Sequence, residues 1–83
     1  MFGIKPLGVN FTMVGLNGCS FWFSYETCIA FSREGKVYHA ESDRKGKKWS
    51  NTTRKHLNQC PPADVTLPYA EFEREATAAY GGA

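Results

Sequence analysis

The dipeptide Asn17-Gly18 lies between two runs of β-prone residues, and it constrains the fold more than any other feature. A type I′ turn needs positive φ at both central positions, which asparagine and glycine adopt most easily. The flanking runs 9–16 and 19–25 are rich in β-branched and aromatic residues whose side chains alternate between two faces. Three aromatic residues of the second run share a face: Phe21, Phe23 and Tyr25. The sequence therefore predicts a β-hairpin.

Further strands are expected after the hairpin. Segments 28–31 and 37–40 are again β-prone, and 33–36 is a polar turn with a glycine available for left-handed geometry. Glycine and proline interrupt 2–8, which predicts an irregular lead-in or a short edge strand. Segment 64–67 either adds a short strand or leads into the next element. We expect an antiparallel sheet of about four or five strands.

Two helices complete the predicted fold. Ser50 is a good N-cap for a helix over about 51–59, which Pro61-Pro62 would end. A second helix is expected over about 68–80, with Thr66 as its N-cap and Gly81 after its last turn. Its apolar residues recur at spacings of three and four, namely Tyr69, Phe72, Ala76 and either Ala79 or Tyr80. This face should pack on the sheet, giving an α+β fold.

The length of 83 residues predicts a single domain over 1–83 with one core. Aromatic residues make up 14% of the chain, and the large area that each one buries helps so small a core to be stable. Such a core leaves little room for an enclosed substrate cavity. The size of the chain therefore argues against an enzyme.

The three cysteines, Cys19, Cys28 and Cys60, cannot all pair within one chain and form no Cys-x-x-Cys motif. The first residues lack the charged and apolar regions of a signal peptide, and no apolar run approaches the roughly 20 residues that cross a bilayer. We therefore expect a cytoplasmic protein whose thiols are mostly buried.

Metal and hydrolytic sites are remote alternatives. His56 and Cys60 are four residues apart and would share a helical face, but Cys19, Cys28 and His39 could complete a ligand set only by a coincidence of the fold. A cysteine–histidine nucleophile pair would need a lowered thiol pKa, which no local sequence indicates. Buried thiols and a surface histidine are the simpler expectation. We predict no metal, no cofactor and no catalytic residue.

Charge is distributed unevenly along the chain. The middle of the chain is basic, beginning with Arg33 and Lys36. The candidate basic face within it consists of Arg44, Lys45, Lys47, Lys48, Arg54 and Lys55. The last helix is acidic through Glu71, Glu73 and Glu75. Such asymmetry favours electrostatically steered association with a partner.

Two classes of partner fit these residues. Nucleic acid would use the basic middle, from Arg44 to Lys55, for phosphate contacts and nearby aromatic rings for stacking. A protein partner would use one charged face and an aromatic anchor, since such residues are enriched at binding hot spots. The candidate anchors are Trp22, Tyr38 and Trp49. The chain itself could be a monomer or a homodimer.

The runs Trp22–Phe31 and Trp49–Asn58 together resemble a pattern found in small uncharacterised proteins of bacteriophages, prophages and microbial genomes. That family is a domain of unknown function. Its polar motif residues, Ser24, Thr52, Thr53 and His56 here, would tie a helix start to a strand by hydrogen bonds.

The resemblance implies a phage or mobile-element accessory protein that binds a host protein complex and blocks it sterically. An anti-CRISPR inhibitor of effector-complex DNA binding is the specific form we expect, because many small phage proteins act in that way. Either charged face could dock on the effector, and the acidic one would resemble the phosphate backbone.

Overall fold

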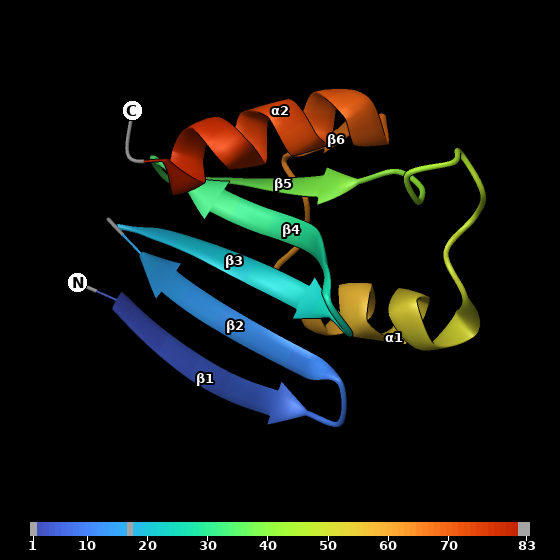
Figure 1. The fold of residues 1–83 in the computed structure, drawn as a ribbon, viewed down its shortest axis with the longest axis horizontal. Helices are drawn as coiled ribbons and strands as arrows, with labels where there is room; N and C mark the ends of the chain where they lie inside the picture. The colour runs from blue at the N-terminus through green and yellow to red at the C-terminus, as the bar shows by residue number, and fades with distance from the viewer. Residues whose placement is uncertain (1, 17, 82–83) are drawn as a thin grey trace.

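Six strands form one sheet in the computed structural model, which describes residues 2–16 and 18–81. The strands are β1 (Phe2–Gly8), β2 (Phe11–Leu16), β3 (Cys19–Ser24), β4 (Thr27–Arg33), β5 (Lys36–Ala40) and β6 (Val65–Leu67). They lie in the sheet in chain order, and the first five form an antiparallel meander (Figure 1). The α+β class and the β2–β3 hairpin are confirmed, with one or two strands more than predicted.

The sheet is mixed, because β6 pairs parallel to β5. The prediction of a wholly antiparallel sheet was wrong at this edge. Between the two strands the chain carries a long loop and helix α1 (Asn51–Gln59), and so β6 re-enters in the direction of β5. Segment 64–67 is thus a strand at 65–67 rather than a simple lead-in.

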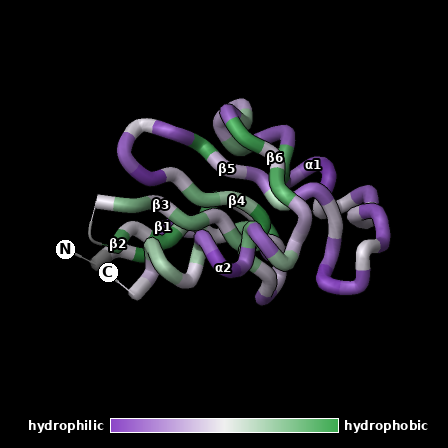
Figure 2. Tube along the Cα trace, turned by 90° about the horizontal axis from the view of Figure 1, so that it is seen from above, coloured by the Kyte–Doolittle hydropathy of each residue, from purple (hydrophilic) through white to green (hydrophobic). Residues whose placement is uncertain are grey.

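The two helices cover opposite faces of the sheet (Figure 2). Helix α2 (Tyr69–Tyr80) packs on the face that carries Phe21 and Phe31. The other face carries Phe11 and Trp22, which cluster with residues in and just after α1. Successive side chains of one strand point to opposite faces, so Phe21 and Trp22 belong to different halves of the core.

Helix α1 has the predicted bounds. The Ser50 hydroxyl accepts a hydrogen bond from the backbone N–H of Thr53 at 3.2 Å, as expected for an N-cap. The helix ends at Gln59, and extended backbone at Cys60 leads into Pro61-Pro62.

Helix α2 buries the predicted face through Tyr69, Phe72, Ala76 and Ala79. The prediction of Thr66 as its N-cap was wrong, because Thr66 lies within β6 opposite His39. Pro68 occupies the cap position without a side-chain hydrogen bond. Its fixed φ is already close to the helical value, so the helix starts without a polar cap.

Three turns differ in how well they were predicted. The turn 33–36 is confirmed, with Glu34 and Gly35 both at positive φ. Strand β2 starts two residues later than expected, because Asn10 has a φ of 57° and turns the chain. Likewise β3 ends at Ser24, and Tyr25 turns with a φ of 58° instead of sharing the face of Phe21.

Two further predictions concern the turn at Asn17-Gly18 and the lead-in segment 2–8. Asn17 lies outside the described residues, whereas Gly18 has the positive φ expected for that turn. The lead-in 2–8 is an edge strand whose register with β2 shifts between Pro6 and Gly8, and Pro6 is tolerated on it because an edge strand pairs on one side only.

Candidate binding surface

The polar motif residues join the end of β3 to the start of α1. The Ser24 hydroxyl lies 3.0 Å from the Thr53 hydroxyl and 2.7 Å from Nδ1 of His56. The Ser50 hydroxyl lies 3.2 Å from the same Thr53 oxygen. Ser24, Thr53 and His56 are all buried, so the hydrogen bonds among them form a directional link between α1 and the sheet. The expected role of the motif in tying helix to strand is therefore observed for Ser24, Thr53 and His56, while Thr52 is exposed.

His56 is buried, and the expectation of a surface histidine was wrong. Its ring stacks on Phe11 with centroids 4.7 Å apart, and Tyr25 lies beside it at 6.4 Å. A serine hydroxyl so close to an imidazole also resembles a nucleophile–base pair. Ser24 is only 2% exposed, however, so its hydroxyl has no path to a substrate in this structure and its contacts serve the fold.

The basic loop between β5 and α1 is organised by Asp43. Its carboxylate accepts hydrogen bonds from the backbone N–H groups of Lys45 and Lys47, at 2.9 and 2.8 Å. Two backbone bonds close the same turn, which passes through Gly46 at a φ of 80°. The loop therefore has a defined shape, and the side chains of its lysines are exposed.

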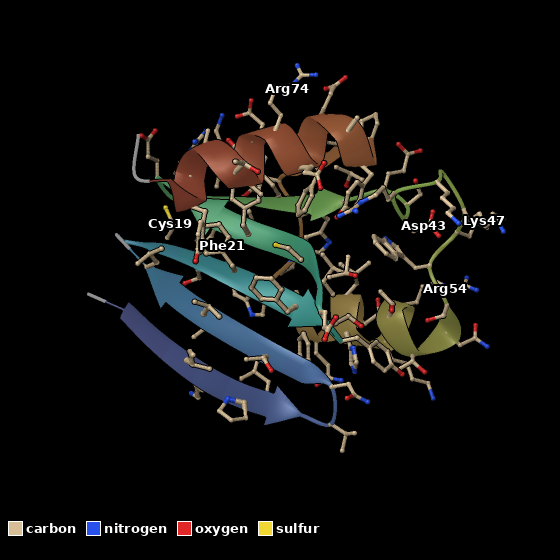
Figure 3. All side chains as sticks on the ribbon, in the orientation of Figure 1. Cys19, Phe21, Asp43, Lys47, Arg54 and Arg74 are labelled. Atoms are coloured by element: carbon tan, nitrogen blue, oxygen red, sulfur yellow. The ribbon has the colours of Figure 1, made fainter. Side chains whose placement is uncertain are left out.

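Five cations at this end of the molecule form what we call the basic surface: Lys45, Lys47, Lys48, Arg54 and Lys55. None of them forms an ion pair within residues 2–16 and 18–81. Arg54 donates a hydrogen bond to the Asn51 side chain, which is neutral. Asp43, Lys47 and Arg54 lie together at one end of the structure, remote from Cys19 at the other (Figure 3).

Arg44 differs from its basic neighbours. It lies 3.3 Å from the carboxylate of Glu73 and over the ring of Tyr69, with its guanidinium carbon 5.8 Å from the ring centroid. Arg44 thus connects the loop to α2. It was predicted as part of the basic face, but its charge is partly matched within the chain.

The acidic face of α2 is largely paired in the same way. Glu75 forms an ion pair with Arg33 at 3.1 Å, and Glu73 pairs with Arg44. Glu71 is exposed and forms no ion pair within the described part of the chain. The structure therefore separates the two faces: two of the three glutamates of α2 are in ion pairs, whereas no cation of the basic surface is in one within the described residues.

The predicted aromatic anchors are mostly used in packing. Trp22 is 7% exposed and belongs to the core, so it offers a partner almost no surface. Tyr38 stacks on Phe31 with centroids 4.6 Å apart. Trp49 donates from Nε1 to the carbonyl oxygen of Ala40 at 3.0 Å, and its ring meets the edge of Tyr69. Both Tyr38 and Trp49 are half-buried.

Two hollows lie beside the basic loop. One of about 420 Å³ has an apolar lining between the sheet and α2, including Phe23, Cys28 and Tyr80. The other, of about 550 Å³, is lined by Lys45, Lys47 and Trp49, with carboxylates among them. They share Glu26, Thr27, Arg44 and Tyr69, and so form one open depression around the start of α2.

The cysteines are unpaired thiols, as predicted, with Cys19 and Cys60 buried. Burial raises the pKa of Cys28 to about 12 and that of Cys60 to about 12. Both thiols are therefore protonated at neutral pH and are poor nucleophiles and metal ligands. Across residues 2–16 and 18–81, no three histidine, cysteine or acidic side chains gather closely enough to hold a metal ion.

Comparison with known proteins gives a family. Residues 7–73 match the Family of unknown function DUF8033. The chain belongs to this family. The match contains the Ser24 network and the whole basic surface, and it ends within α2 before Glu75. Among curated proteins and among solved structures, no match was found. Neither helix of the described segments is long and apolar enough to cross a membrane.

Proposed function

We propose that the chain is a non-catalytic binding protein whose basic surface docks on an acidic surface of another protein. One observation carries the proposal, namely the way the charges are paired. Glu73 and Glu75 each hold an ion pair with an arginine of the same chain, whereas no residue of the basic surface forms one within the described residues. Unmatched charges that lie close together attract a partner of opposite sign and steer its approach.

The mixed lining of the adjacent depression favours a protein over a nucleic acid. Glu26, Asp43 and Glu73 lie among the lysines and arginine around it. A phosphate backbone would be repelled by these carboxylates, while a protein can place both acidic and basic groups opposite them. The apolar part of the depression could also accept a side chain of the partner.

More specifically, we propose that the chain is a phage or mobile-element accessory protein that works in the host cytoplasm. Its target would be a host protein complex, with a CRISPR effector as the leading candidate. Docking by the basic surface would block target DNA sterically. A protein that acts by occupying a site needs no cofactor and no catalytic residue, and the protonated thiols of Cys28 and Cys60 support this form of the proposal.

The first experiment is a pull-down from host lysate with tagged protein, before and after nuclease treatment. The test variant carries Lys45→Glu and Lys47→Glu, since both side chains are exposed. The matched control carries Lys5→Glu and Lys36→Glu, which change the charge equally on strands β1 and β5. We expect a nuclease-resistant partner that the control retains and the test variant loses. Equal recovery by both variants would contradict the proposal.

Nucleic-acid binding by the same surface is the second candidate, and the five unmatched cations favour it. It predicts direct affinity of the isolated protein for DNA or RNA, falling steeply as salt rises because bound counterions are released. A partner lost on nuclease treatment, together with such a salt dependence, would select this candidate. Catalysis is tested by stoichiometry, because a blocker acts at about one copy per target and an enzyme far below it.

A further inference from the structure

Two adjacent turns present apolar side chains to solvent at the end of the sheet that carries the basic surface. Val9, in the turn between β1 and β2, is 85% exposed, and Tyr25, between β3 and β4, is 55% exposed. The backbone N–H of Tyr25 donates to the carbonyl oxygen of Asn10 at 2.7 Å, which holds the two turns together. Both residues were overlooked in the sequence, where each was assigned to a strand.

Tyr25 has a backbone conformation that suits its residue type poorly. Its φ is 58°, in the left-handed region, where a bulky side chain is an outlier. Asn10 has nearly the same φ, but asparagine tolerates it. The turn between β4 and β5 also has a non-glycine residue at positive φ, Glu34 at 54°, but a glycine, Gly35, follows it. An exposed tyrosine kept in a strained turn is a reason to look for a role outside folding.

The position of Tyr25 links the two halves of the basic surface. On one side its ring lies beside His56 of α1, the helix that carries Arg54 and Lys55. On the other side the next residue, Glu26, lines the hollow that also contains Lys45 and Lys47. Tyr25 therefore lies between helix α1 and the hollow, the two parts of the molecule that supply these cations.

A purely structural role for Tyr25 is the competing explanation, since its ring could shield the Ser24–Thr53–His56 network from water. Phe11 already covers the flat face of the His56 ring, stacked at 4.7 Å and buried. More than half of Tyr25 remains in contact with solvent. A residue whose main task was shielding would be expected to bury more of its ring.

We infer that Tyr25, with Val9 beside it, is the apolar anchor by which this chain binds its protein partner. The partner would offer an apolar pocket ringed by carboxylates, matching an aromatic anchor surrounded by lysine and arginine. Such a layout is typical of protein interfaces, in which central aromatic residues carry most of the affinity and charged residues form the rim. The inference deepens the proposed function and rests on it.

The test uses NMR titration of the full chain with a synthetic heptapeptide in which leucine and tryptophan alternate with glutamate. A matched peptide carries lysine in place of each glutamate. We expect the acidic peptide to shift the signals of Val9, Tyr25 and the basic loop, and the lysine peptide to leave them unchanged. Equal shifts with both peptides, or none with the acidic one, would overturn the inference.

Tyr25→Asn removes the ring while keeping a residue that accepts positive φ, so the fold should persist. Ile4→Asn is the matched control, because Ile4 is 61% exposed and lies on the edge strand β1, outside the lining of both hollows. We expect Tyr25→Asn to weaken binding of the acidic peptide about tenfold, and Ile4→Asn to leave it unchanged. Circular dichroism checks that each variant is folded.

The outcomes separate the anchor from the proposed function. If Lys45→Glu with Lys47→Glu abolishes binding while Tyr25→Asn binds like the wild type, the anchor is wrong and the charged surface stands. If the acidic peptide binds neither the wild type nor the Tyr25→Asn variant, and a single-stranded oligonucleotide binds the wild type, the proposed function fails as well. If Tyr25→Asn is unfolded at the titration temperature, the folded variant Tyr25→Phe replaces it. Weaker peptide binding by Tyr25→Phe supports a contact through the tyrosine hydroxyl. Unchanged peptide binding, with the NMR signals of the ring at position 25 unshifted, refutes the anchor.

Discussion

The two helices are held to the same sheet in different ways. Helix α2 is attached by apolar packing, with Phe72 and its neighbours against Phe21 and Phe31. Helix α1 has only a small apolar contribution and is attached through the Ser24 network. Packing tolerates small shifts of a helix, whereas hydrogen bonds between short side chains fix its position. The helix fixed by directional bonds also carries two of the five cations of the basic surface, Arg54 and Lys55.

Phe72→Ala should have the largest effect. Phe72 is almost fully buried between α2 and the sheet, and deletion of such a ring leaves a cavity. We expect the free energy of unfolding to fall by about 3–5 kcal/mol. Urea denaturation measures the loss. A change as small as that of the exposed control Glu71→Ala would show that α2 is not attached by packing.

Ser24→Ala tests the other attachment. It removes the hydroxyl shared by Thr53 and His56 and leaves their buried polar groups without that partner. The expected loss in the free energy of unfolding is about 1–3 kcal/mol. Ser20→Ala is the control, because Ser20 is a half-buried serine of the same strand. Equal losses in the free energy of unfolding for the two substitutions would show that the Ser24 network does not hold α1 to the sheet.

The partly buried thiol of Cys28 on the α2 side gives a prediction on pH. Its pKa is raised by burial from 9.0 to about 12, so above pH 9 the unfolded chain releases a proton that the folded chain retains. Stability therefore falls as pH rises, by at most about 1 kcal/mol for this thiol between pH 9 and about pH 10. Urea denaturation of wild type and Cys28→Ala across this interval isolates the effect. Parallel pH profiles would show that Cys28 titrates normally in the folded protein.

The smallest effect is expected for the ion pair between Arg33 and Glu75. Both side chains are partly exposed, so solvent screens their attraction. Glu75→Gln should lower the free energy of unfolding by no more than about 0.5 kcal/mol, and less at high salt. Binding of the acidic peptide should not change. Weaker peptide binding by Glu75→Gln would place the acidic face in the interface.

Much of the fold was accessible from local sequence signals. Ser50 and Pro61 gave the bounds of α1, and residue spacing gave the buried face of α2. Each of these features depends on a few neighbouring residues, which is why they could be predicted. The parallel pairing of β6 was missed because it depends on the path of the chain across a sheet face, to which residues 65–67 give no local clue.

The candidate site was harder to predict for the same reason. The charges of the basic surface were visible in the sequence, but the ion pair that sets Arg44 apart from them depends on α2 lying next to the loop. His56 was expected at the surface because a histidine in a polar helix has no local reason to be buried. Tyr25 was assigned to a strand because tyrosine has high β-propensity, and nothing near it indicated positive φ. An aromatic residue between a strand and a polar dipeptide could have suggested a turn.

The parallel strand β6 has a consequence for the order of folding. Strands β1 to β5 join neighbours in the chain and need only short loops to close, whereas β6 must wait until residues 41–64 have been brought back to β5. We therefore expect the meander to form early and β6 to dock late. The basic loop and α1 both belong to the segment closed by this step. A chain still emerging from the ribosome would lack the assembled binding surface until residues 65–67 had become available.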